Sequence, residues 1–126
     1  MKVADEVWIT TAILHRENPR KQDFTVQEIV RRAKLEEMTP THRAGVSVHV
    51  YLQCVANRPP NPARYRMLLE TAKSRRRLFR TGDPFHIERD GSKTKPSPSD
   101  IPPKYHYLLE WYDSDYNASE PQKQGD

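Results

Sequence analysis

Apolar residues recur at helical spacing in the first half of the chain and at alternating spacing further on. Val3, Val7 and Leu14 lie on one face of a helix over residues 3–17, because their spacing matches the 3.6-residue helical period. Asn18-Pro19 follows, and proline disfavours helical geometry at the residue before it. The pattern therefore predicts an amphipathic helix that ends at this point.

The next apolar pattern, over residues 24–34, begins with a helix start signal. Thr25 and Glu28 form the T-x-x-E capping box, and Phe24 and Ile29 have the spacing of a hydrophobic staple. We expect a helix here, preceded by a very short strand over Asp23-Phe24. Its buried stripe consists of Val26, Ile29, Val30 and Ala33.

A third helix is expected from Thr39, a plausible cap, and Pro40, a plausible first helical residue, to about Ala56. On a helical wheel, the residues that we expect to meet the core lie on one apolar face: Ala44, Val48, Tyr51, Leu52 and Val55. Val50 and Cys54 extend this face on one side. The opposite arc is polar, so we expect it to face solvent; it holds His42, Gly45, His49 and Gln53, with Arg43 at its border.

After a proline-rich linker the period changes to about two, which is typical of strands. Apolar residues alternate over residues 64–69, residues 71–74 are polar and turn-like, and a second short run covers residues 77–80. Two such runs around a short turn predict a β-hairpin. Its rim and tip are basic: Arg64, Arg66, Lys73, Arg75, Arg76, Arg77 and Arg80.

The last third of the chain is less regular. Residues 86–100 have the composition of a loop, and apolar spacing predicts a final helix that starts near Pro102-Pro103. Residues 113–126 are polar and acidic, so we expect a disordered tail. The sequence thus predicts an α+β fold in a single domain over residues 1–112, with three helices, a hairpin and a C-terminal helix.

The charge distribution is far more uneven than the net charge of +4 on 126 residues suggests. Residues 39–80 hold nine Lys or Arg and one acidic residue, a net charge of +8, whereas residues 100–126 carry −4. A concentrated basic stretch is typical of a protein that binds a polyanion. A solvated charged surface is the ordinary alternative.

Several classes of protein receive no support from the sequence. A single cysteine, Cys54, excludes an internal disulfide framework and zinc sites with several cysteines. No apolar run is long enough for a transmembrane helix, and the first residues lack a signal core, so we expect a cytoplasmic protein that does not bind membranes. Common phosphate-loop, dinucleotide and hydrolase motifs are absent, so we expect no cofactor, no metal and no enzymatic activity. A nuclease using His86, Glu88 and Asp90 is a weaker alternative.

The order of these elements resembles a winged-helix domain, a helix-turn-helix followed by a β-hairpin wing. The likeness covers about residues 3–81 and is carried by residues 24–28, by residues 39–43 with their helix, and by the hairpin over residues 64–80. The resemblance implies that the third helix enters the major groove of DNA and that the wing contacts the neighbouring backbone or minor groove. Parts of residues 54–112 also resemble a family of short uncharacterised bacterial proteins, which adds little about function.

Candidate DNA contacts follow from this resemblance and from side-chain chemistry. Arginine can bind guanine through two hydrogen bonds and glutamine can pair with adenine, whereas phosphate contacts give affinity without sequence readout. Candidates for base contacts are Thr41, His42, Arg43, Val46, His49 and Gln53. Candidates for phosphate contacts are Arg64, Arg66, Lys73, Arg75, Arg76, Arg77 and Arg80.

The resulting expectation is a non-catalytic protein that binds double-stranded DNA, as a transcriptional regulator for example. A protein-interaction module on the same scaffold and an RNA-binding protein stay open, because fold does not fix function. The aromatic residues of the C-terminal helix are compatible with a core or with the seam of a homodimer.

Overall fold

The computed structural model describes residues 1–39, 44–60 and 64–118. Within these ranges the chain is an α+β protein with four α-helices and a small antiparallel sheet of three strands, which confirms the predicted class. No described helix is both long and apolar enough to cross a lipid bilayer. The helices and strands are α1 (Val3–Glu17), β1 (Phe24–Thr25), α2 (Val26–Glu36), α3 (Gly45–Val48), β2 (Leu68–Ala72), β3 (Arg75–Leu78) and α4 (His106–Trp111).

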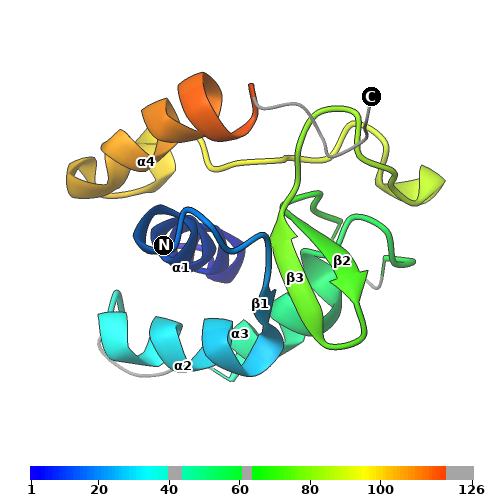
Figure 1. The fold of residues 1–126 in the computed structure, drawn as a ribbon, viewed down its shortest axis with the longest axis horizontal. Helices are drawn as coiled ribbons and strands as arrows, with labels where there is room; N and C mark the ends of the chain where they lie inside the picture. Colours follow the sequence, from blue (N-terminus) through cyan, green and yellow to red (C-terminus); the bar gives the residue numbers. More distant parts are fainter. Residues whose placement is uncertain (40–43, 61–63, 119–126) are drawn as a thin grey trace.

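Helix α1 is the centre of the molecule. Figure 1 shows it between α4 on one side and α2 and α3 on the other, with the sheet beside it. All its residues from Ala4 to His15 are buried, including the carboxylate of Asp5. Neither oxygen of Asp5 has a hydrogen-bond partner, and burial raises the pKa of this group. The predicted bounds of the helix are confirmed, but it is covered on all sides rather than on one face.

Helix α2 begins as the capping box predicts. The Thr25 hydroxyl accepts a hydrogen bond from the Glu28 amide at 3.0 Å, and the Glu28 carboxylate accepts one from the Thr25 amide at 2.7 Å. Two of the amides left open at a helix start are therefore satisfied by side chains. Phe24 and Ile29, the expected staple pair, are both fully buried in the same cluster.

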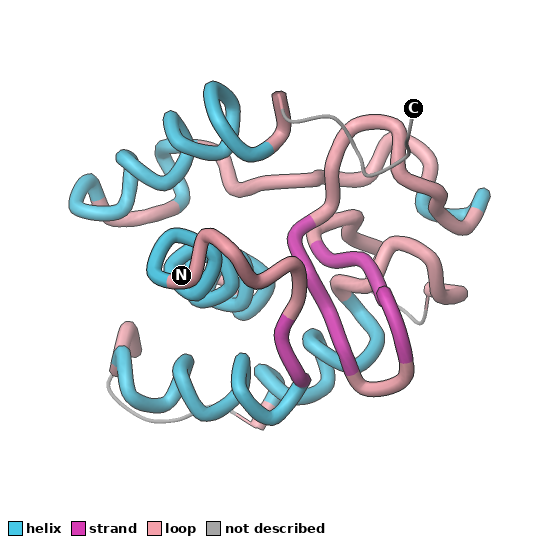
Figure 2. The backbone as a smooth tube through the Cα atoms, in the orientation of Figure 1, coloured by secondary structure: helices cyan, strands magenta, loops and turns pink. Residues whose placement is uncertain are grey.

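The three strands are ordered β1-β3-β2, so the first strand of the chain pairs with the last (Figure 2). Phe24 lies opposite Arg76, and Leu68 lies opposite Leu78. The hairpin is confirmed, but its turn is tighter than predicted. Strand β2 runs on to Ala72, so only Lys73 and Ser74 form the turn, with Ser74 at a positive φ of 60°.

Helix α3 continues into a π-helical turn (His49–Gln53), three residues short of the predicted end at Ala56. Val55 instead forms a bridge with Leu68, and the Ala56 amide donates to the Leu68 carbonyl at 2.7 Å. The chain therefore leaves the helix to meet the sheet. The predicted start of this helix at Thr39 and Pro40 is not tested, because residues 40–43 lie outside the described part of the chain.

The chain after the hairpin wraps around the other elements before it reaches α4. Short 3₁₀ turns lie at Ile87–Arg89, Pro98–Asp100 and Pro103–Tyr105, and a π-helical turn (Tyr112–Tyr116) extends α4. The Tyr116 hydroxyl donates to the Leu78 carbonyl at 2.7 Å, and Tyr112 donates to the Phe79 carbonyl.

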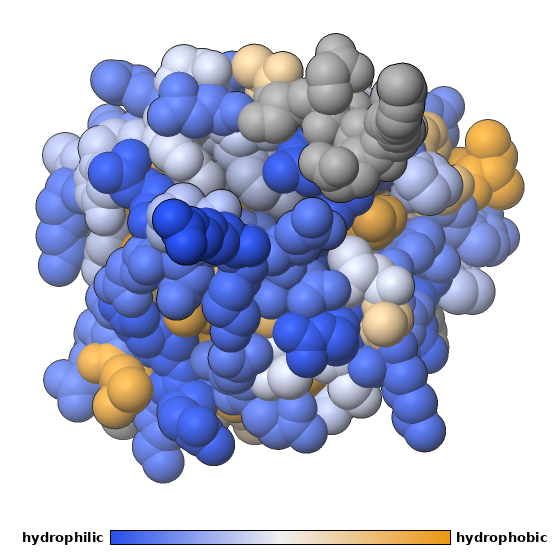
Figure 3. All heavy atoms as spheres, viewed as in Figure 1, coloured by the Kyte–Doolittle hydropathy of each residue, from blue (hydrophilic) through white to orange (hydrophobic). Residues whose placement is uncertain are grey.

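The predicted start of the disordered tail at residue 113 is therefore too early. Residues 113–117 belong to the fold, because two tyrosines anchor this turn to the end of β3 and the Asn117 side chain accepts a hydrogen bond from the Thr81 amide at 2.8 Å. Residues 119–126 lie outside the described part of the chain. The face of the molecule seen in Figure 3 is mostly hydrophilic, in keeping with a core that lies around α1.

Candidate nucleic-acid interface

The end of the third helix is held by Arg76. This residue is the middle one of the arginine triplet in β3, Arg75, Arg76 and Arg77. Its guanidinium is 1% exposed and donates to the carbonyls of Val50 at 3.0 Å and Tyr51 at 3.3 Å. The last carbonyls of a helix have no partner within the helix and carry the negative end of its dipole, so a cation there is stabilising. Glu70 lies 3.7 Å away and balances the charge.

A second buried arginine, Arg89, completes this cap. It reaches in from the 3₁₀ turn after the hairpin and donates to the carbonyls of Leu52 at 2.8 Å and Gln53 at 2.7 Å. It also donates to the carbonyls of Arg58 and Tyr65, both at 2.7 Å. Four successive carbonyls, from Val50 to Gln53, therefore accept hydrogen bonds from two arginines. Nothing in the local sequence around Arg89 signals this role, since it depends on a loop that returns to the helix.

The solvent face of the third helix is the one that the sequence assigned to the core. Val48 is 47% exposed and Tyr51 is 43% exposed, whereas Val46 and Val50 are fully buried. Ala44 is also exposed. The predicted orientation is therefore wrong for Ala44, Val48 and Tyr51, whereas Val50, Cys54 and Val55 are buried as predicted. Val46, Val50 and Cys54 form a second apolar stripe at i, i+4 and i+8, and this stripe packs into the core.

The observed orientation of the helix changes which of the candidates for base contacts are accessible. Val46 is buried and is not available to DNA. His49 is half-buried and its Nδ1 lies 2.9 Å from the Gly45 carbonyl, while Gln53 is half-buried at the capped end of the helix. A Cβ on Gly45 would lie 3.7 Å from Val3, so this glycine faces α1. Thr41, His42 and Arg43 lie outside the described residues.

The remaining arginines of the hairpin contact groups within the protein. Arg75 donates to Asp23 at 2.8 Å, and Arg77 binds both carboxylate oxygens of Asp83 at 2.8 and 2.9 Å. Asp83 is only 7% exposed, so the second pair is largely shielded from solvent. The triplet therefore does not present three free cations at the hairpin tip, which was the expectation from its charge.

Arg66 and Arg80 are likewise engaged. The guanidinium of Arg66 lies 4.6 Å from the centre of the Phe85 ring and donates to the Ser92 carbonyl at 3.1 Å. Arg80 lies 4.1 Å from the centre of the Tyr116 ring and donates to the carbonyl of the same residue at 3.1 Å. Arginine can form such contacts and still present part of its guanidinium to solvent.

Two of the phosphate candidates are exposed. Lys73 lies in the hairpin turn, where β2 meets β3, and Arg64 lies before β2, with a hydrogen bond to the Glu88 carbonyl at 3.3 Å. Arg75 adds partial exposure, with 38% of its side chain open to solvent beside Asp23. The cations available to a partner on this side of the molecule are therefore fewer than the charge of residues 39–80 suggests.

The residues of the alternative nuclease reading are not gathered into a metal site. The His86 Nδ1 accepts a hydrogen bond from the Glu88 amide at 3.2 Å, while the side chains of Glu88 and Asp90 are exposed. Among the described residues, no three His, Cys, Asp or Glu side chains come together as metal ligands. Cys54 is fully buried, and burial raises the pKa of its thiol, so it is a core residue rather than a reactive one.

Comparisons with known proteins add no relative to this picture. No protein-family model matches the sequence, and no curated protein or solved structure matches it either.

Proposed function

We propose that the chain is a winged-helix protein that binds double-stranded DNA without catalysing a reaction, with the third helix at the major groove and the hairpin at the backbone. In this proposal it acts in the cytoplasm as a regulator of transcription. The observation that carries the proposal is the topology: three helices precede a hairpin whose second strand pairs with β1, in the order β1-β3-β2.

The open face of the third helix supports the proposal. Ala44, Val48 and Tyr51 are exposed on it. A small or apolar side chain can contact a thymine methyl group, and a tyrosine hydroxyl can donate to a phosphate or a base edge. Residues near the start of such a helix usually contact bases, so Thr41, His42 and Arg43 stay candidates in this proposal.

The hairpin makes a smaller contribution than the sequence suggested. Lys73 in the turn is the exposed cation best placed at the tip, and Arg75 is partly open beside it. Each phosphate that a protein neutralises contributes about −0.9 to the slope of log K against log salt. With two or three such contacts we expect a slope of about −2 to −3, whereas engagement of five hairpin arginines would give about −4 to −5.

The test is a salt titration of binding to mixed-sequence duplex DNA, for the unaltered protein and for Lys73→Ala. The variant should reduce the size of the slope by about one and weaken binding at low salt. Lys104→Ala is the matched control, since Lys104 is exposed near α4 and away from the hairpin. Absence of binding at low salt, or binding that is independent of salt, would overturn the proposal.

A protein partner is the second candidate, and the uncharged face of the third helix favours it. Residues 44–53 contain no Lys, Arg, Asp or Glu, and exposed aromatic and aliphatic side chains are common at protein interfaces. The partner in this alternative is another protein or a second copy of the chain. Light scattering measures the mass of the protein in solution and so detects a homodimer. Competition between single-stranded RNA and duplex DNA in the salt titration tests RNA binding.

A further inference from the structure

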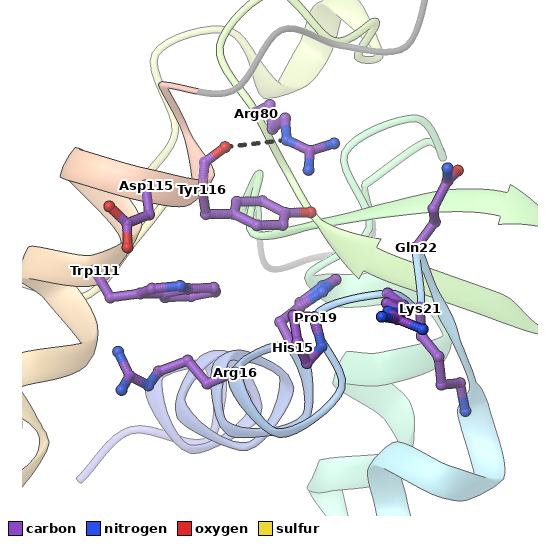
Figure 4. A pocket seen from close by; sticks show the side chains of 10 residues that line it. His15, Arg16, Pro19, Lys21, Gln22, Arg80, Trp111, Asp115 and Tyr116 are labelled. Atoms are coloured by element: carbon purple, nitrogen blue, oxygen red, sulfur yellow. Dashed lines mark hydrogen bonds between the residues drawn. The ribbon is translucent and has the colours of Figure 1, made fainter.

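A cavity of about 520 Å³ opens between the end of α1, the loop before β1, the end of β3 and the C-terminal turn (Figure 4). None of its lining residues comes from α2, the third helix or the hairpin turn. It is therefore separate from the surface proposed for DNA. Its volume lies within the range of about 300–1,000 Å³ that is usual for small-molecule sites.

One side of the cavity is aromatic. The rings of Trp111 and Tyr116 lie with their centres 5.3 Å apart, and the His15 ring lies 4.7 Å from Tyr116 and 6.3 Å from Trp111. Figure 4 shows the three side chains coming together from α1, from the end of α4 and from the π-helical turn that follows it. Trp111 is only half-buried, so part of its ring is open to a ligand. Flat aromatic surfaces of this kind bind planar rings by stacking.

His15 contributes a neutral ring to the aromatic side of the cavity. Its Nε2 accepts a hydrogen bond from the Leu78 amide at 3.2 Å, so the proton of the neutral ring lies on Nδ1. Burial, together with the charges of Arg80 and Arg77, lowers the pKa of His15 to about 3, and Asp23 opposes this shift. The ring is therefore neutral at physiological pH, with a fixed tautomer set by β3.

The rim of the cavity is basic. Arg16, Arg20, Lys21 and Arg80 line it together with one carboxylate, that of Asp115. Arg16 and Arg20 form no ion pair with a described residue, and the guanidinium of Arg16 lies 5.1 Å from the centre of the Tyr107 ring. The Lys21 Nζ forms an ion pair with the Glu28 carboxylate at 3.1 Å. Cations outnumber carboxylates here, and hydrogen bonds from arginine to phosphate or carboxylate are among the strong ones.

We infer that this cavity binds a small planar aromatic anion, such as a nucleoside monophosphate or an aromatic carboxylate. The aromatic part of the ligand stacks on Trp111, and its anionic group binds Arg16 and Arg20. Both halves are needed, because the rim alone would bind any anion and the aromatic side alone would bind any planar ring. The site is independent of whether the third helix binds DNA.

Isothermal titration calorimetry with AMP and with salicylate tests this inference on the full chain. We expect saturable binding of at least one probe at micromolar to millimolar concentration, and at least tenfold weaker binding of ribose 5-phosphate, which lacks the ring, and of adenosine, which lacks the phosphate. A dinucleotide that binds as tightly as AMP would also support the inference. It would show that the planar aromatic anion can be the end of a nucleic acid rather than a free nucleotide.

Two variants separate the halves of the site. Arg16→Ala combined with Arg20→Ala should weaken binding at least tenfold, and Trp111→Leu should remove the preference of AMP over ribose 5-phosphate. Arg31→Ala, on the exposed side of α2, is the matched control and should bind as the unaltered protein does. Melting temperatures report whether each variant is folded, and the exposed pair Arg16 and Arg20 keeps the test open if Trp111→Leu does not fold. Failure of both probes to bind at millimolar concentration, or equal weakening by Arg31→Ala, would overturn the inference.

Discussion

The hairpin and the cavity are both rich in cations, but most of the hairpin cations contact groups within the protein, whereas two of the four cations that line the cavity form no hydrogen bond or ion pair with a described residue. Arg76 and Arg77 of the hairpin are buried against carbonyls and against Asp83. At the cavity, Arg16 and Arg20 are exposed and have no ion pair with a described residue. Cations that already have partners stabilise the fold, while unpaired cations beside an open volume are available to a ligand.

This difference does not follow the local density of charge. Three consecutive arginines in β3 give the highest density of positive charge in the chain, yet alternate residues of a strand point to opposite faces. Arg76 therefore turns toward the third helix, and Arg75 and Arg77 turn toward separate carboxylates. Acceptors that lie far apart in the sequence decide which cations stay free.

The largest effect is expected from Arg89→Met, which removes half of the helix cap. Five backbone carbonyls lose a charged donor, and since each buried acceptor left unsatisfied costs about 1–3 kcal/mol, we expect a total of about 3–5 kcal/mol after partial rearrangement. Urea denaturation at pH 7 should show a loss of this size in the free energy of unfolding. A loss below about 1 kcal/mol would mean that Arg89 does not hold the end of the helix.

The next effect concerns pH and the buried ring at the cavity. Because the pKa of His15 is lowered to about 3 in the folded protein, the unfolded chain takes up a proton below pH 6.5 and the folded chain does not. Stability contributed by this group is complete above pH 6.5 and is lost as the pH falls toward 3, at up to about 1.4 kcal/mol per pH unit. His15→Gln, which can still accept from the Leu78 amide, should show a shallower loss in denaturation between pH 6.5 and 4. An unchanged slope would contradict the buried neutral state.

A smaller effect of opposite sign is expected from Asp5→Asn. Burial raises the pKa of Asp5, with Lys93 opposing and Asp100 reinforcing the shift, so stability is lost as the pH rises from 3.8, where the unfolded chain ionises, to the raised pKa of the folded protein, and the loss is complete above it. The variant should be more stable than the unaltered protein at pH 7, by roughly 1–2 kcal/mol, because a charged group without hydrogen bonds costs more than a neutral one. The gain should vanish as the pH falls well below 3.8, where both states of the unaltered protein are protonated. A loss of stability at pH 7 would show that Asp5 has a partner.

The smallest effect is expected from Arg75→Ala. Its pair with Asp23 is partly exposed on both sides, and such pairs contribute about 0–1 kcal/mol. Thermal denaturation should therefore show little change. A cost comparable to that of Arg89→Met would erase the distinction between the exposed and the buried arginines.

Local signals were enough to predict much of the fold. The capping box of α2, the bounds of α1 and the hairpin follow from short patterns whose partners are a few residues apart. The orientation of the third helix could not be predicted in the same way. Both of its faces carry valines, and His49 can be half-buried because its ring bonds to the Gly45 carbonyl one turn earlier.

The candidate sites depended on contacts over longer distances. Arg89 lies 36 residues after Gln53, whose carbonyl it binds, and Tyr116 lies 38 residues after Leu78. No periodicity in the sequence reports such pairs. The cavity is built from three separate segments, and no pattern in the sequence predicts that these segments meet.

The most direct test of the account is duplex-DNA binding by Tyr51→Ser, compared with His49→Gln and with Leu35→Ser as a control for the loss of an exposed apolar side chain. If the exposed face of the third helix binds DNA, Tyr51→Ser should weaken binding by about tenfold or more, while the other two variants should bind as the unaltered protein does. The opposite result, in which His49→Gln loses affinity and Tyr51→Ser retains it in folded protein, would contradict the assignment of the exposed face of the third helix to DNA.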